Sequence, residues 1–203
     1  MKKLIITAAI VSSMFSSAAF AKDDAVGIAI THVAVNNQYN FQNVHYSTYD
    51  LKNQNVSFSL DYTHAFGEQF NKNLVLNGNI FYDYLNNDAN NFEGDRIILN
   101  HRIGAQVEAG YKFFNKVAPF VTIGLSDSIY GIGWYDNTVR SRNVNSGIDP
   151  IYGLGVAYDL NKDNYATVKY NYQAIDLDGP DNQRNDTYYS KIQTIKLGIS
   201  HKF

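Results

Sequence analysis

The stretch from residue 191 to residue 203 alternates between apolar and polar side chains at every second position. One face carries Gln193, Ile195, Leu197, Ile199, His201 and Phe203, and the other carries Thr194, Lys196, Gly198, Ser200 and Lys202. This period of two predicts a β-strand with one apolar and one polar side. Such a strand needs hydrogen-bonding partners on both edges, so the rest of the chain must supply a sheet for it.

Seven earlier segments show the same alternation, and no helical period competes with it after residue 21. They cover approximately residues 25–36, 56–66, 74–85, 102–113, 121–126, 152–160 and 166–174. The connections alternate between long and short, with long polar segments at 37–53, 86–96, 130–149 and 176–189. An even number of strands of about ten residues each, joined in this way, is typical of a barrel that crosses a membrane. We therefore predict an all-β fold, an eight-stranded antiparallel up-and-down transmembrane β-barrel in which the last strand pairs with the first and the seventh.

Aromatic residues fall into two bands when the strand directions alternate. The end with the short turns receives Tyr62, Phe66, Tyr111, Phe113, Tyr158 and Phe203. The opposite end receives Tyr82, Tyr84, Tyr152, Tyr170 and Tyr172. Aromatic girdles at both membrane interfaces are a feature of transmembrane barrels.

A soluble eight-stranded barrel is the main alternative, because it shows the same alternation with the polarity reversed. The polar face of these strands mixes charged residues with Gly, Ser, Thr and Asn, which suits a packed and hydrogen-bonded interior. This mixture, the sorted connection lengths and the aromatic borders favour the membrane barrel.

The first 21 residues are predicted to be a secretory signal peptide, not part of the fold. Lysines at positions 2 and 3 precede a mostly apolar stretch, and Ala19-Phe20-Ala21 is a small-x-small cleavage signal. The apolar stretch is too short to span a membrane. The mature chain is therefore expected to form one barrel domain over residues 22–203.

Composition excludes several classes of function. The chain has no cysteine, so disulfides and thiol chemistry are not available. The formal net charge is −2, and it becomes −4 when the two lysines of the signal peptide are removed. This balance gives no reason to expect a nucleic acid or another polyanion as partner.

These features resemble the small eight-stranded outer-membrane β-barrels of Gram-negative bacteria, which include the OmpA transmembrane domain, the OmpX–Ail group and the opacity-type surface proteins. The resemblance covers the whole mature chain and rests on the signal ending at residue 21, the eight alternating segments and the terminal run 196–203. It implies a chain in the cell outer membrane, in contact with its lipid. It also implies that Phe203 is an assembly signal for the barrel-assembly machinery. His201 stands where the family often has an aromatic residue.

Seven charged residues on the polar face are expected to line the lumen: Asp61, Asp83, Arg102, Glu108, Lys112, Lys169 and Lys196. A buried charge needs a partner, and eight strands leave an interior that side chains can fill. We expect a salt-bridge network that stabilises the barrel. The alternative is a gate on a narrow ion pathway, which similar clusters suggest in OmpA-like barrels.

Catalysis is not expected. The histidines are His32, His45, His64, His101 and His201, and neither a Gly-x-Ser-x-Gly nor a His-Glu-x-x-His motif occurs. We predict no catalytic residues, no metal site and no cofactor. A lipid-modifying outer-membrane enzyme is the less favoured alternative.

The long connections are the expected functional regions, since surface loops carry function on rigid scaffolds. Their candidate partner-binding residues are Tyr39, Phe41, Tyr46, Tyr49, Trp134, Tyr135, Arg140, Arg142, Tyr188 and Tyr189. Tyr, Trp and Arg dominate protein interfaces. These residues predict adhesion to, or binding of, a host or environmental surface protein, with Trp134 as the first candidate. A small porin-like channel or a purely structural membrane protein is the alternative.

Overall fold

The computed structural model describes residues 24–40, 49–66, 71, 73–90, 96–114, 116–133, 142–178 and 187–203. The strands are β1 (Asp24–Asn40), β2 (Tyr49–Ala65), β3 (Leu74–Asn90), β4 (Arg96–Tyr111), β5 (Val117–Gly133), β6 (Arg142–Asp159), β7 (Asn164–Asp178) and β8 (Thr187–Lys202). No helix among the described residues is long and apolar enough to cross a membrane. The predicted signal peptide lies outside the described residues.

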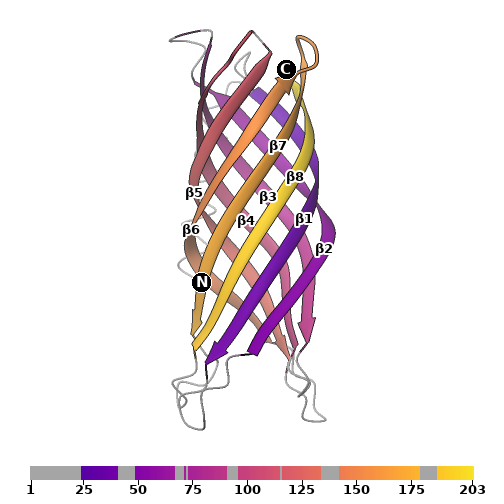
Figure 1. Cartoon of the computed structure of the whole chain (residues 1–203), viewed down its shortest axis with the longest axis vertical. Coiled ribbons are helices and arrows are strands. Elements are labelled where there is room, and N and C mark those ends of the chain that lie inside the picture. The colour runs from indigo at the N-terminus through magenta and orange to yellow at the C-terminus, as the bar shows by residue number, and fades with distance from the viewer. Residues whose placement is uncertain are drawn as a thin grey trace.

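The eight strands form one closed antiparallel barrel in chain order (Figure 1). The C-terminal strand β8 pairs with β7 on one edge and with β1 on the other. The pairing with β1 runs from Ala25↔Lys202 to Asn40↔Thr187. The predicted all-β fold, strand number and closure are therefore confirmed.

The barrel has two ends. We call the end with connections 66–73, 112–116 and 160–163 the turn end; it also carries the C-terminus and lies at the top of Figure 1. The opposite end, with connections 41–48, 91–95, 134–141 and 179–186, is the loop end.

The strands are longer than the predicted ten or so residues, ranging from 15 residues in β7 to 18 in β6. The prediction was too short because apolar alternation marks only part of each strand. Toward the loop end the ladder continues through polar residues, such as Asn36↔Lys52 and Gln38↔Asp50 between β1 and β2. Part of each predicted long connection is therefore paired strand.

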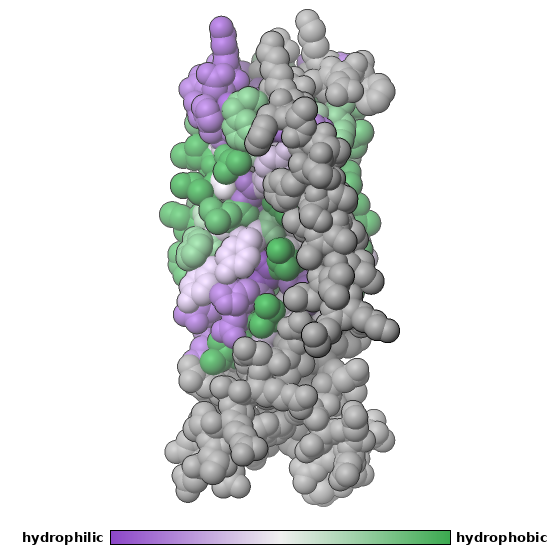
Figure 2. All heavy atoms as spheres, turned by 180° about the vertical axis from the view of Figure 1, so that it is seen from behind, coloured by the Kyte–Doolittle hydropathy of each residue, from purple (hydrophilic) through white to green (hydrophobic). Residues whose placement is uncertain are grey.

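The two faces of the wall follow the predicted alternation. Large apolar side chains point outward and are exposed, including Ile28, Ile123, Leu154 and Leu197. In Figure 2, hydrophobic residues gather in a band across the coloured part of the wall, with hydrophilic residues above and below it. The inward positions carry buried polar and charged side chains, such as Asn79, Gln106 and Thr194.

The wall is not paired continuously at the loop end. Pairing between β2 and β3 stops at Phe58↔Tyr84, and pairing between β6 and β7 stops at Ile151↔Gln173. The other six pairings continue further toward the loop end. In this part of the barrel the chain therefore forms two four-stranded sheets, β7-β8-β1-β2 and β3-β4-β5-β6.

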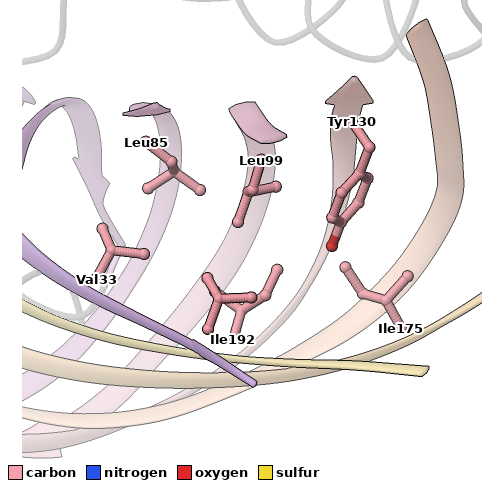
Figure 3. Close-up of a cluster of buried hydrophobic side chains, with 7 residues drawn as sticks. Val33, Leu85, Leu99, Tyr130, Ile175 and Ile192 are labelled. Carbon is pink, nitrogen blue, oxygen red and sulfur yellow. The ribbon is translucent and has the colours of Figure 1, made fainter. Parts of the chain in front are cut away.

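An apolar cluster packs between these two sheets. Its buried members are Val33, Val35, Leu85, Leu99, Tyr130, Ile175 and Ile192. Figure 3 shows side chains from β1, β7 and β8 facing those from β3, β4 and β5. The cluster fills the lumen at this level as a sandwich core would, and it replaces the missing strand pairing as the contact between the sheets.

We predict that Leu99→Ala lowers the free energy of unfolding by about 2–5 kcal/mol, because a buried cavity is left between the sheets. Leu99 is 1% exposed. The matched control is Leu125→Ala, which changes an outward side chain that is 55% exposed and leaves no enclosed cavity. Denaturant unfolding in lipid vesicles measures both, and an equal loss in the two variants would contradict the assignment of the cluster as a core.

Candidate functional site: the lumen and the outer strand ends

Asp83 on β3 is the centre of the lumen charges. Its Oδ2 accepts hydrogen bonds from Arg102 Nε at 2.9 Å and Nη2 at 2.6 Å, and its Oδ1 accepts one from Lys196 Nζ at 2.5 Å. The three side chains are at most 2% exposed. A carboxylate held between two cations satisfies the pairing that buried charges need, and it joins β3 and β4 to β8 across the lumen.

Phe81 packs against both cations of this cluster. The centroid of its ring lies 5.5 Å from Arg102 Cζ and 4.5 Å from Lys196 Nζ. Its register partner on β4 is Gly104, where an added Cβ would lie 2.5 Å from Phe81 Cζ. The ring therefore occupies the space that the glycine leaves, and its face receives the positive charges.

Two lysines, Lys169 and Lys196, are direct register partners on β7 and β8. Like charges in this arrangement repel each other unless each has its own anion. Lys169 Nζ donates to Glu108 Oε1 at 2.6 Å, whereas Lys196 pairs with Asp83 and lies 3.8 Å from Asp61 Oδ1. The two cations thus turn to acids on different strands.

A third group of charges lies at the turn end. Lys112 Nζ is 3.0 Å from Asp159 Oδ2, and Lys202 Nζ is 3.7 Å from Asp159 Oδ1. These three residues line a cavity of about 90 Å³ together with Glu108 and Tyr165. Their side chains are 17–29% exposed, so these ion pairs are more exposed to solvent than the Asp83 cluster.

The order of these groups along β4 shows how the lumen is filled. From the loop end to the turn end, the inward residues include Leu99 in the apolar cluster, Arg102 beside Asp83, and Glu108 beside Lys169. Lys112, just after the strand, follows with the turn-end charges. Side chains occupy the interior at each of these levels, as expected for a barrel of eight strands.

The structure places the predicted loop residues differently. Tyr39, Tyr49, Arg142, Tyr188 and Tyr189 lie on strands β1, β2, β6 and β8, so their assignment to loops was wrong. The physical reason is the polar extension of the ladder beyond the apolar part of the wall. The remaining candidates, Phe41, Tyr46, Trp134, Tyr135 and Arg140, lie outside the described residues.

Register brings three of these tyrosines into one row. Tyr39 on β1 is the partner of Tyr49 on β2 and, across its other edge, of Tyr188 on β8. Tyr189 is the partner of the neighbouring Gln38. Residues that are far apart in the sequence therefore lie side by side at the loop end of one paired sheet.

The described histidines lie outside the lumen network. Asp24 accepts a hydrogen bond from Tyr62 Oη at 2.9 Å, and its Oδ1 lies 2.5 Å from His64 Nδ1. His101 Nδ1 is 2.8 Å from Tyr82 Oη. The described residues contain no group of three or more His, Cys, Asp or Glu side chains that could hold a metal ion.

Asp159, Lys202, Phe81 and Tyr130 are among the lumen residues that the sequence prediction did not name. Asp159 and Lys202 lie on the polar face, so their position in the alternation was a usable signal. Phe81 and Tyr130 are buried lumen residues, although aromatic side chains were expected on the outer wall. The alternation marks their inward direction, but it does not say that an aromatic ring fits there.

The sequence matches the family described as outer membrane protein beta-barrel domain over residues 7–203. No curated protein matches it significantly.

Solved structures of similar fold share little sequence with the chain. Neisserial surface protein A is 15% identical, with a TM-score of 0.54, over 87% of this chain and 97% of its own. The outer membrane protein OprG from Pseudomonas aeruginosa is 12% identical, with a TM-score of 0.55, over 89% and 96%. The outer membrane protease OmpT from Escherichia coli is 9% identical, with a TM-score of 0.53, over 92% and 99%.

At this level of identity the likeness concerns the fold alone. The match to the family itself covers nearly the whole sequence, and the closed eight-stranded wall agrees with it. The chain belongs to the outer membrane protein beta-barrel domain family and is a protein of the outer membrane.

Proposed function

We propose that this barrel is a surface protein that binds a host or environmental protein through its loop end. The observation that carries the proposal is the row of Tyr49, Tyr39 and Tyr188 on three paired strands. Tyrosine supplies a large contact area at low conformational cost and is enriched at the centres of protein interfaces. Phe41, Tyr46, Trp134, Tyr135, Arg140 and Arg142 remain part of the proposed surface.

The length of the strands supports this proposal. Tilted strands of about 9–11 residues are enough to cross a bilayer, but the strands of this barrel have 15–18 residues. Outer-membrane barrels have their short turns in the periplasm, so the excess length extends the loop end outward. The tyrosine row then stands on a hydrogen-bonded sheet, which loses less entropy on binding than free loops would.

A small porin-like channel is the second candidate function. The buried Asp83 cluster and the apolar cluster both occupy the described lumen, and they favour a structural role for the charges over conduction. We therefore propose that the lumen network stabilises the barrel. Lipid modification is the less favoured alternative. It would change the lipid A mass spectrum, whereas we expect the spectra of cells with and without the protein to be the same.

The first prediction from the proposed function concerns binding. Tyr39→Ala combined with Tyr188→Ala should weaken binding to host-cell surface protein by about tenfold or more, as expected when central interface residues are truncated. The matched control is Tyr152→Ala, an outward tyrosine of the wall that is 49% exposed. Adhesion of cells that display equal amounts of each variant measures the effect, and unchanged adhesion of the double variant would refute the proposed surface.

The second prediction concerns the lumen charges. Asp83→Asn removes the anion that Arg102 and Lys196 share, and it should cost about 3–5 kcal/mol of stability because two buried cations lose their partner. Asp61→Asn is the control, since Asp61 lies 3.8 Å from Lys196 and is 14% exposed. Denaturant unfolding in lipid vesicles compares the two variants.

Planar-bilayer recordings separate the structural role from conduction. The unmodified barrel should give no steady unit conductance. A steady conductance that changes with Asp83→Asn would favour the channel.

The third prediction concerns assembly. We propose that Phe203 is read by the barrel-assembly machinery, so its deletion should lower the amount of inserted barrel more than it lowers binding per inserted molecule. Phe114→Ala is the control, because Phe114 is also at the turn end and is 94% exposed. Heat-modifiable gel migration of outer-membrane fractions reports insertion, and normal insertion without Phe203 would overturn this assignment.

A further inference from the structure

Strand β7 has an edge that no described residue pairs with. Its ladder with β6 ends at Gln173, but its ladder with β8 continues to Asp178↔Thr187. Within the described part of the chain, residues 174–178 are therefore paired on one side only. Figure 1 shows β6 bending away from β7 toward the loop end.

The direction of the backbone groups on this edge follows from two backbone hydrogen bonds near the turn end. Leu160 N donates to Asn164 O, and Lys202 N donates to Asp163 O. In an antiparallel ladder the backbone groups of successive residues point to opposite neighbours. The even residues of β7 thus face β6, so Ala174, Asp176 and Asp178 direct their N–H and C=O groups to the unpaired edge.

Pro150 explains why the ladder ends where it does. Continuing the register from Ile151↔Gln173 would make Pro150 the partner of Ala174. Proline has no N–H, so it cannot donate to the Ala174 carbonyl. The ladder of β6 with β5 is unaffected and includes Leu125↔Pro150.

The other break in the wall, between β2 and β3, is held by side chains. Asn55 Nδ2 on β2 donates to Leu85 O and Asn86 O on β3, both at 2.8 Å. Asn87 Nδ2 donates to Asn53 O at 3.4 Å. Asparagine side chains there bond to backbone carbonyls beyond the end of the ladder.

The last residue pairs of the β6/β7 ladder indicate where the open edge begins relative to the membrane. Tyr152↔Tyr172 is the pair next to Ile151↔Gln173, and both tyrosines belong to the aromatic band at the loop end. Aromatic bands lie at the membrane interface. The edge therefore begins where the wall leaves the lipid, and it is accessible to a partner from outside the cell.

We infer that the β7 edge, residues 174–178, binds an extended basic segment of a partner protein, which adds to the sheet as a further strand. An open edge offers main-chain hydrogen bonds to any extended peptide, and the side chains beside it select among peptides. Asp176 and Asp178 occupy alternate positions on this edge, so a segment with Lys or Arg at alternate positions is favoured. This inference rests on the proposed protein-binding function and states the kind of segment that is bound.

A short synthetic peptide of alternating lysine and valine is the probe, and the unmodified barrel in lipid nanodiscs is the receptor. The peptide should bind, and the same peptide with alternate amides N-methylated should bind about tenfold more weakly or worse, because it cannot complete the ladder. Hydrogen exchange gives the position: the amides of Ala174, Asp176 and Asp178 should exchange faster than those of Ile175 and Leu177, and the peptide should slow them.

Two variants separate the backbone from the charge. Asp176→Pro removes one N–H from the open edge and leaves the ladder with β8, and it should weaken peptide binding by about tenfold. Asp176→Asn keeps the N–H and should cause a smaller loss together with a weaker salt dependence. Protected amides at Ile175 and Leu177 would show that the proline variant is still folded.

Three results would overturn the inference: no binding of the peptide, equal binding of the N-methylated peptide, or protected amides at Ala174, Asp176 and Asp178 in the free barrel. If cells still adhere but the peptide does not bind, the inference about the edge is rejected and the proposed function stands. Peptide binding at the edge without any adhesion would reject the proposed function, but the inference that the edge binds a peptide would stand.

Discussion

The pairing of β8 with β1 is the contact on which the rest of the molecule depends. Lipid offers no hydrogen bonds to the backbone, so a sheet in a membrane must have no free edge. The ladder from Ala25↔Lys202 to Asn40↔Thr187 meets this requirement along the full length of both strands. Closure also creates a lumen that is narrow enough for side chains to fill, and so the inward residues must satisfy one another.

The charges of the lumen follow from that second requirement. Arg102, Lys169 and Lys196 are buried among strands that carry only a few acids, and each of the three cations has a carboxylate within 2.6 Å. The residue types on this face could be predicted from the alternation alone. The ion pairs could not be predicted in this way, because the partner of a lysine depends on how far the side chains reach across the lumen. Lys169 and Lys196 are neighbours in register, yet they turn to Glu108 and Asp83.

The sequence predicted the wall best where lipid touches it. A residue such as Leu197 is apolar because it faces acyl chains, and this makes the strand count, the two faces and the closure readable. Beyond the lipid, both faces of a strand can be polar, and the signal disappears although the strand continues. Tyr39 and Tyr188 were assigned to loops for this reason, and their position in one row depends on register, which no single strand reveals.

The two breaks in strand pairing, between β2 and β3 and between β6 and β7, show where the membrane constraint stops. One begins at the aromatic pair Phe58↔Tyr84, and the other begins at Ile151↔Gln173, the pair next to Tyr152↔Tyr172. Pro150 lies directly beyond Ile151↔Gln173, and the side on which its N–H is missing faces β7. A proline in place of Leu154, which lies deeper in the wall, would leave the Tyr170 carbonyl without its hydrogen-bond donor. Water could not replace that donor within the lipid. If the aromatic band marks the outer interface, as we propose, a proline at position 150 is tolerated because water can reach the neighbouring strand there.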